Sequence, residues 1–133
     1  MIVVDASAML ETLLQTSAAQ AVRRRLFSPG ETLHAPHLLD VEVAQVVRRY
    51  ALAGEIDAER GQTALGTLVT FPIRRYAHEF LLPRIWQLRN NLSAYDAVYV
   101  ALAEVLDAPL VTCDRRLLTA ASRHASVELI GIQ

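Results

Sequence analysis

The chain has 133 residues, 53% of them hydrophobic and 20% charged, with a formal net charge of −1, so we expect residues 1–133 to form a single domain with an ample core. Charges interrupt the apolar runs before they reach membrane-spanning length, which argues against a transmembrane helix and any membrane association. The single cysteine excludes an internal disulfide, and the first ten residues lack the basic leader of a secretory signal, so we expect a cytoplasmic protein.

In chain order, β-branched apolar runs alternate with longer segments of helical periodicity. Ser7 is expected to cap the first helix, Pro36 to lie in the first turn of the third, and Ser93 with Asp96 to form a capping box. The expected strands are 1–5, 32–35, 73–77, 109–114 and 127–132, and the expected helices are 8–15, 16–30, 37–54, 57–71, 78–90, 93–104 and 115–122. Alternation of this kind predicts an α/β fold with a short, mostly parallel sheet between layers of helices.

Two acidic side chains interrupt apolar helical segments without a cation one turn away. Asp96 has Leu92, Ser93, Tyr99 and Val100 at the spacings of three and four residues that bring helical side chains together. Glu42 is similarly surrounded by uncharged neighbours. Burial of an unpaired carboxylate costs several kcal/mol or forces its protonation, so both residues are candidates for a functional site. The structural alternatives are that Asp96 only completes the cap and that Glu42 is a satisfied, partly buried acid.

Two further aspartates, Asp5 and Asp114, each end an apolar strand. In an open parallel sheet, ligands bind beyond the carboxyl ends of the strands, although an aspartate there can also simply cap the following helix. Ser7 and Thr112 lie two residues from these aspartates, where a hydroxyl can cap a helix or orient a carboxylate or a water.

If Asp5, Glu42, Asp96 and Asp114 converge, their mutual repulsion favours a divalent cation, and four hard oxygen ligands suit Mg²⁺ or Mn²⁺ better than zinc. Setting these four aside leaves 10 acidic residues against 13 basic ones, all arginine, and the guanidinium group matches phosphate oxygens. The remainder of the molecule would carry a charge of +3, which is compatible with a phosphate-bearing partner.

Four segments together resemble the signatures of PIN-domain ribonucleases, and the length resembles that of the VapC toxins of toxin–antitoxin pairs. These segments are IVVDASAML from Ile2, EVAQVVRR from Glu42, SAYDAVYVALAE around Asp96 and LVTCDRRL around Asp114. Such toxins often carry asparagine three residues after the glutamate, where this chain has Gln45, and Asp40 is the alternative if the second position is misplaced.

The resemblance implies an α/β/α sandwich and an endoribonuclease that depends on Mg²⁺ or Mn²⁺, with a metal-activated water as nucleophile and products with 5′-phosphate and 3′-hydroxyl ends. By position, Asp5, Glu42, Asp96 and Asp114 would be the catalytic acids, with Asp5, Asp96 and Asp114 as metal ligands. Ser7 and Thr112 would be supporting hydroxyls, and Arg115 and Arg116 are candidates for contacts with the RNA backbone. The implied partners are RNA, a cognate VapB-like antitoxin and a second copy of the chain in a homodimer.

Three other functions are alternatives to this one. A housekeeping RNA-processing nuclease with a PIN domain would carry the same acids. A catalytically weak PIN-like module that binds RNA or protein is disfavoured because all four acids are present. A phosphatase of the haloacid-dehalogenase type is disfavoured because Ser7 occupies the place of its second aspartate and lysine is absent from the sequence. The four scattered histidines do not match the spacing of a zinc site, and Cys113 is expected to be a small buried hydrophobe.

Overall fold

The computed structural model describes residues 1–130 of the chain, and these residues alternate between short strands and longer helices. The strands are β1 (Ile2–Val4), β2 (Leu33–Pro36), β3 (Ile73–Tyr76), β4 (Leu110–Thr112) and β5 (Val127–Leu129). The helices are α1 (Ala6–Leu13), α2 (Ala19–Leu26), α3 (Leu38–Leu52), α4 (Ala58–Thr70), the 3₁₀ helix η1 (Glu79–Leu81), α5 (Leu82–Gln87), α6 (Ala94–Leu106) and α7 (Arg115–Ala121).

The five strands form one parallel sheet in the order β3-β2-β1-β4-β5. β1 lies at the centre, where Val3 pairs with His34 of β2 and Val4 pairs with Val111 of β4. All three residues of β1 are buried, as expected for a β-branched strand that is covered on both faces. The prediction of a short parallel sheet is therefore confirmed.

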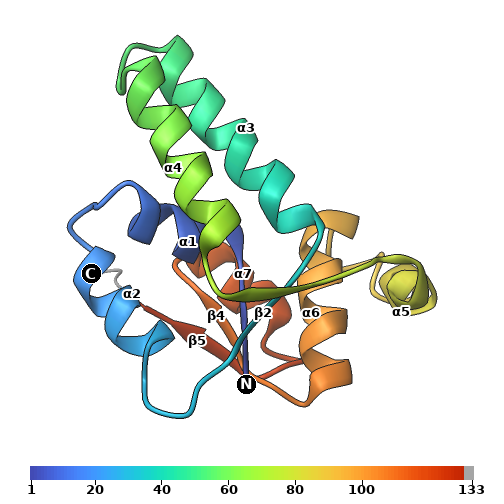
Figure 1. Cartoon of the computed structure of the whole chain (residues 1–133). Helices are drawn as coiled ribbons and strands as arrows, with labels where there is room; N and C mark the ends of the chain where they lie inside the picture. The colour runs from blue at the N-terminus through green and yellow to red at the C-terminus, as the bar shows by residue number, and fades with distance from the viewer. Residues whose placement is uncertain (131–133) are drawn as a thin grey trace.

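The strand order places helices on both faces of this sheet. Right-handed crossovers from β1 to β2 and from β2 to β3 put α1 to α4 on one face, and the crossovers that return to β4 and on to β5 put α6 and α7 on the other. Figure 1 shows α3 and α4 projecting from the sheet as a long hairpin, with α6 beside the sheet and α5 at the outer end of the molecule. The predicted α/β/α sandwich is confirmed.

Helix α6 forms much of the core because it packs against β1, β2 and β4. Seven consecutive residues, Ala97–Ala103, are buried, which explains why this segment is almost entirely apolar. Asp96 lies in the first turn, immediately before the buried stretch. α6 has 13 residues, and within residues 1–130 no helix combines the length and apolarity needed to cross a bilayer.

Several predicted boundaries differ from the structure. Asp5 caps α1, because its side chain accepts a hydrogen bond from the backbone of Ala8, so the assignment of Ser7 as the cap is wrong. Pro36 is the last residue of β2 rather than part of α3. The single helix expected over 78–90 is instead η1 followed by the short α5, with Pro83 in the first turn of α5, where its missing N–H is tolerated. β5 ends at Leu129, and residues 131–132 of the predicted strand lie outside the described residues.

Candidate active site

Asp5 and Asp114 meet beyond the carboxyl ends of two neighbouring strands. Asp5 directly follows β1, and Asp114 lies two residues beyond the end of β4, which pairs with β1. Thr112 joins them: its Oγ1 donates to Asp5 Oδ2 at 2.5 Å and accepts the backbone N–H of Asp114 at 2.9 Å. The parallel pairing of the two strands thus brings together two acids that are more than a hundred residues apart in the sequence.

Asp5 is enclosed by hydrogen-bond donors. Its side chain is buried, and its Oδ1 accepts from Ser7 Oγ at 2.7 Å and from the backbone N–H of Ala8 at 3.0 Å. Ser7 Oγ in turn accepts the backbone N–H of Cys113 at 2.9 Å and lies 3.1 Å from Thr112 Oγ1. Both predicted supporting hydroxyls therefore contact Asp5 and fix its orientation. Burial raises the pKa of Asp5, although the hydrogen bonds from Thr112, Ala8 and Ser7 oppose this shift.

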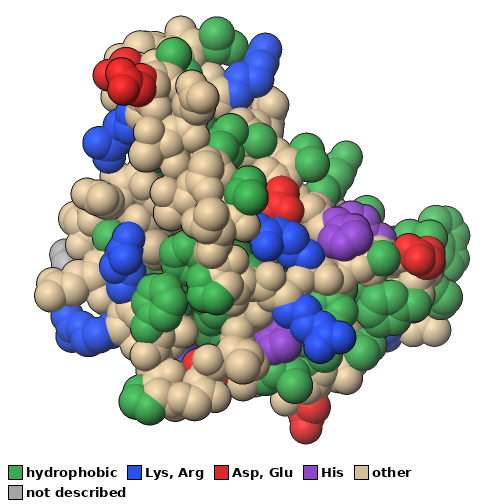
Figure 2. Space-filling view, viewed as in Figure 1, with side chains coloured by type: hydrophobic (Ala, Val, Ile, Leu, Met, Phe, Trp, Pro, Cys, Tyr) green, Lys and Arg blue, Asp and Glu red, His purple; other side chains and the backbone are tan. Residues whose placement is uncertain are grey.

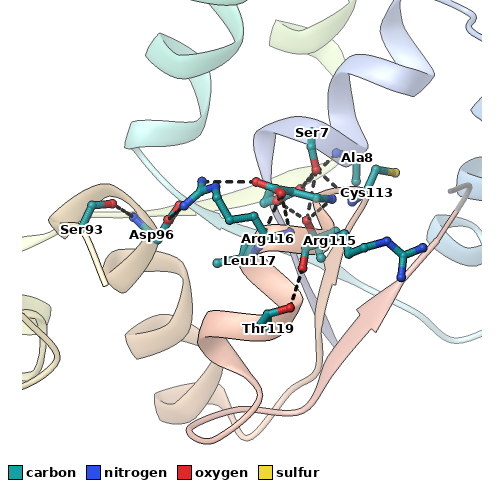
Figure 3. A network of polar contacts seen from close by, with 12 residues as sticks. Ser7, Ala8, Ser93, Asp96, Cys113, Arg115, Arg116, Leu117 and Thr119 are labelled. Carbon is teal, nitrogen blue, oxygen red and sulfur yellow. Dashed lines mark hydrogen bonds and ion pairs between the residues drawn. The ribbon is translucent and has the colours of Figure 1, made fainter. Parts of the chain in front are cut away.

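Asp96 and Asp114 share one cation, the guanidinium of Arg116. Arg116 Nη1 lies 3.1 Å from Asp96 Oδ2, and Nη2 lies 3.3 Å from Asp114 Oδ2. Figure 3 shows the Arg116 side chain reaching from α7 toward Asp96 at the start of α6, while Arg115 points away from the network. The two charges raise the pKa of Arg116, with Asp96 as the larger cause. The cation missing from the helical neighbours of Asp96 is therefore supplied by a different helix.

Tyr99, which the sequence analysis did not select as a site residue, joins Glu42 to the helix that carries Asp96. Tyr99 donates from its hydroxyl to Glu42 Oε1 at 2.5 Å. Tyr99 lies three residues after Asp96, so the two side chains share a face of α6. Burial raises the pKa of Glu42, and the negative charges of Asp5 and Asp96 add to the shift. Asp5 and Asp96 are thus near enough to Glu42 to oppose its ionisation.

Asp40, the alternative to Glu42, has a cation of its own. Its two carboxylate oxygens accept from Arg75 Nε at 2.7 Å and Arg75 Nη2 at 3.0 Å. By contrast, none of the ion pairs found within residues 1–130 involves Glu42. The bidentate pair with Arg75 accounts for Asp40 structurally, whereas the position of Glu42 has no such explanation.

The thiol of Cys113 takes no part in this network. Cys113 is buried, and burial raises the pKa of its thiol to about 12. Only its backbone N–H contacts the site, through Ser7. A protonated, buried thiol is a poor nucleophile, so the expectation that Cys113 serves as a small hydrophobe agrees with its surroundings.

The donor set and its charge fit a hard divalent cation. The four acids offer only carboxylate oxygens, and the negative charges of Asp114, Asp5 and Asp96 raise pKa values within the group. As the side chains stand, no three acids, histidines or cysteines within residues 1–130 are arranged to hold a metal ion. The guanidinium of Arg116 lies between two of the candidate ligands in this arrangement, and its one positive charge is shared by Asp96 and Asp114.

Two surface features bear on the surroundings of the acidic group. A groove of about 440 Å³ runs beside it, lined in part by Ser7, Glu42, Gln45 and Tyr95. Hydrophobic side chains gather at the outer end of the molecule over α5, visible at the right of Figure 2. Phe80, Leu82 and Trp86 are exposed there, with Trp86 66% accessible, so neither Phe80 nor Trp86 belongs to the core.

Sequence comparisons with known proteins give matches that cover most of the chain. The sequence profile of the PIN domain matches residues 2–122. The VapC ribonuclease Mb0985 of Mycobacterium bovis is 50% identical over 117 residues, covering 88% of each chain. Ribonuclease VapC12 of Mycobacterium tuberculosis is 42% identical over 131 residues, covering 98% of this chain and all of the relative.

A solved structure gives the same fold at much lower identity. A chain in the crystal structure of VapBC2 from Rickettsia felis, bound to a DNA fragment from the promoter, superposes with a TM-score of 0.72 and 13% identity. The match covers 98% of this chain and 99% of that one.

Proposed function

This chain belongs to the PIN domain family, and we propose that it is a divalent-metal-dependent endoribonuclease, the toxin of a VapBC-type toxin–antitoxin pair. One observation carries the proposal: acids from four separate segments gather beyond the carboxyl ends of the strands. Thr112 joins Asp5 to Asp114, Arg116 joins Asp114 to Asp96, and Tyr99, on the helix that carries Asp96, binds Glu42. Residues 1–133 form one domain in this proposal.

In the proposed site, Asp5, Asp96 and Asp114 would hold Mg²⁺ or Mn²⁺. The ion would polarise a phosphodiester oxygen and lower the pKa of a water, as divalent ions do in hydrolytic sites. Ser7 and Thr112 keep the carboxylate of Asp5 in one orientation. Glu42 is the fourth catalytic acid, and Tyr99 fixes its carboxylate. Burial raises the pKa of Tyr99, so its hydroxyl remains a neutral donor to Glu42.

RNA is the proposed substrate because the names of the relatives describe ribonucleases and because the surroundings of the site suit a polyanion. Arginines supply every basic side chain, and apart from the four acids the chain carries more positive than negative charges. The groove lined by Ser7 and Glu42 lies beside the carboxylates, so an RNA strand bound in this groove would reach them. Arg115 points away from the network and is exposed, so it remains a candidate for a backbone contact at the rim.

The proposed partners are a VapB-like antitoxin and a second copy of the chain. The shared fold with a chain of the VapBC2 assembly supports the first. The exposed apolar side chains of Phe80, Leu82 and Trp86 support the second, because an isolated domain rarely leaves such a group uncovered without a partner.

Cleavage of total RNA by the purified chain tests this function. We expect degradation that requires Mg²⁺ or Mn²⁺, stops with a chelator and yields products sensitive to a 5′-phosphate-dependent exonuclease. Asp96→Asn should lower the rate by about 100-fold or more, as loss of a group that acts directly on the transition state does. Asp40→Asn is the matched control and should retain activity, because Asp40 pairs with Arg75 outside the acidic group. Cleavage that persists in Asp96→Asn, or that continues unchanged in the presence of the chelator, contradicts the proposal.

Expression in a bacterial host separates the toxin from a housekeeping nuclease. Induction of the wild-type chain should arrest growth, and induction of Asp96→Asn should not. If the wild-type chain cleaves RNA in vitro but its induction leaves growth normal, the RNA-processing role is favoured.

A further inference from the structure

The Arg116 guanidinium engages one particular oxygen on each of two acids. Its Nη1 and Nη2 contact the Oδ2 atoms of Asp96 and Asp114. Oδ1 of Asp114 is already occupied, because it accepts the backbone N–H groups of Arg116 and Leu117 at the start of α7. Oδ2 is therefore the Asp114 oxygen left to bind a cation, and Arg116 occupies it.

We propose that Arg116 is a built-in competitor of the divalent cation, which must displace its guanidinium from Asp96 and Asp114 in order to bind. The inference rests on the proposed metal-dependent function and adds a residue that sets how much metal the site requires. In the metal-free protein, Arg116 neutralises part of the repulsion between the acids. When the ion binds, it takes over this role and the guanidinium is released.

The exposure of Arg116 makes such an exchange feasible. Its side chain is 70% accessible, whereas that of Asp96 is 18% accessible, so the guanidinium can leave without disrupting the core. Exposed ion pairs are individually weak, and a divalent ion brings twice the charge to the same oxygens. Arg116 is the second residue of α7, so its side chain stays beside the site after release. Its charge is then available to a substrate phosphate.

Mg²⁺ titration of the full chain by calorimetry, without RNA, tests the exchange. Arg116→Gln removes the competitor, and we expect its Kd for Mg²⁺ to fall about fivefold, the size expected when two exposed ion pairs no longer compete. Arg116→Lys keeps the charge but lacks the planar guanidinium that spans two carboxylates. Its Kd for Mg²⁺ should therefore lie between those of Arg116→Gln and the wild type. Arg115→Gln is the matched control: it removes the same charge from the adjacent position, and its Kd should stay close to that of the wild type.

Thermal unfolding gives a second readout that is independent of catalysis. Without metal, Arg116→Gln should melt below the wild type, because Asp96 and Asp114 lose their shared cation. At saturating Mg²⁺ this difference should disappear.

Two results would overturn the inference while leaving the proposed function intact. The first is an equal Mg²⁺ affinity of Arg116→Gln and the wild type. The second is a gain in Mg²⁺ affinity in Arg115→Gln as large as that in Arg116→Gln, which would indicate a general charge effect. A different result, no Mg²⁺ or Mn²⁺ binding by any of the four proteins, would contradict the metal dependence of the proposed function and remove the inference with it.

Discussion

At the scale of single residues, Asp5 is a buried carboxylate whose ionisation opposes folding. Three hydrogen bonds support its charged form, yet burial prevails and its pKa lies above the ordinary value near 4. Glu42 shifts in the same direction. Acids of this kind are costly in the metal-free fold, and the proposed cation would offset that cost.

The pH dependence of stability should reveal this cost. Because the folded state raises the pKa of Asp5, it binds the proton more tightly than the unfolded state does. The stability contributed by protonated Asp5 is therefore complete below about pH 4 and is lost as the pH rises through the raised value. In metal-free urea unfolding from pH 4 to 7, the wild type should lose free energy of unfolding relative to Asp5→Asn. A difference between the two proteins that stays constant with pH would contradict the shift.

Two buried threonines should respond in opposite ways to the loss of a hydroxyl. Thr112 donates to Asp5 and accepts from the backbone of Asp114, so Thr112→Val should lower the free energy of unfolding by about 1–3 kcal/mol. Thr12 is fully buried, and its hydroxyl has no hydrogen-bond partner within residues 1–130. Thr12→Val should therefore be neutral or stabilising by about 1 kcal/mol. Urea unfolding at pH 7 measures both variants, and an unchanged free energy of unfolding in Thr112→Val would show that the Thr112 network is energetically unimportant.

At the scale of elements, α3 and α4 approach closely at one glycine. A Cβ built on Gly61 of α4 would lie 3.1 Å from Cγ1 of Val47 on α3, whereas a Cβ on Gly66 would meet no atom within 4 Å. In sequence the two glycines are alike, because each lowers the helical propensity of its segment. The structure separates them, because Gly61 permits the helix contact and Gly66 has open space beside it.

This difference predicts two unequal alanine substitutions. Gly66→Ala should stabilise the protein by about 0.5–1 kcal/mol, because alanine favours the helical conformation. Gly61→Ala carries the same helical gain, but Val47 must shift to admit the methyl group, so the net change should be clearly smaller or destabilising. Thermal unfolding of the two variants compares them directly. An equal gain in stability at both positions would indicate that Val47 shifts to admit the methyl group without an energetic cost.

At the scale of the whole molecule, the sequence predicted what local patterns and parallel topology dictate. β1 and β4 were recognisable as short buried strands, and their parallel pairing was sufficient to place Asp5 and Asp114 together. The capping of α6 by Ser93 was likewise local and is confirmed. These features need only periodicity and the direction of the strands.

Contacts between side chains of different helices were not predictable in this way. The bond from Tyr99 to Glu42 joins residues 57 positions apart, and Arg116 reaches Asp96 from 20 positions away. Both depend on where the start of α6 lies relative to α3 and α7, which no local pattern specifies. Ser7 and Asp5 both offered a cap for the first helix in the sequence, and local pattern did not decide between them, so Ser7 was assigned to a position that Asp5 occupies.

The assembly proposed for the whole molecule can be measured by light scattering coupled to size exclusion. We expect a mass of twice the 14.7 kDa of one chain, because Phe80, Leu82 and Trp86 leave an apolar surface exposed. A single-chain mass across the accessible concentration range would contradict the homodimer.

Crystals grown with Mn²⁺ test the central claim most directly, because anomalous scattering locates the ion without reference to activity. We predict one strong peak within coordination distance, about 2.1 Å, of carboxylate oxygens from Asp5, Asp96 and Asp114, with Arg116 moved away from them. An ion bound elsewhere, or no ion at saturating Mn²⁺ with Arg116 still bridging Asp96 and Asp114, would contradict a shared metal site at this edge of the sheet.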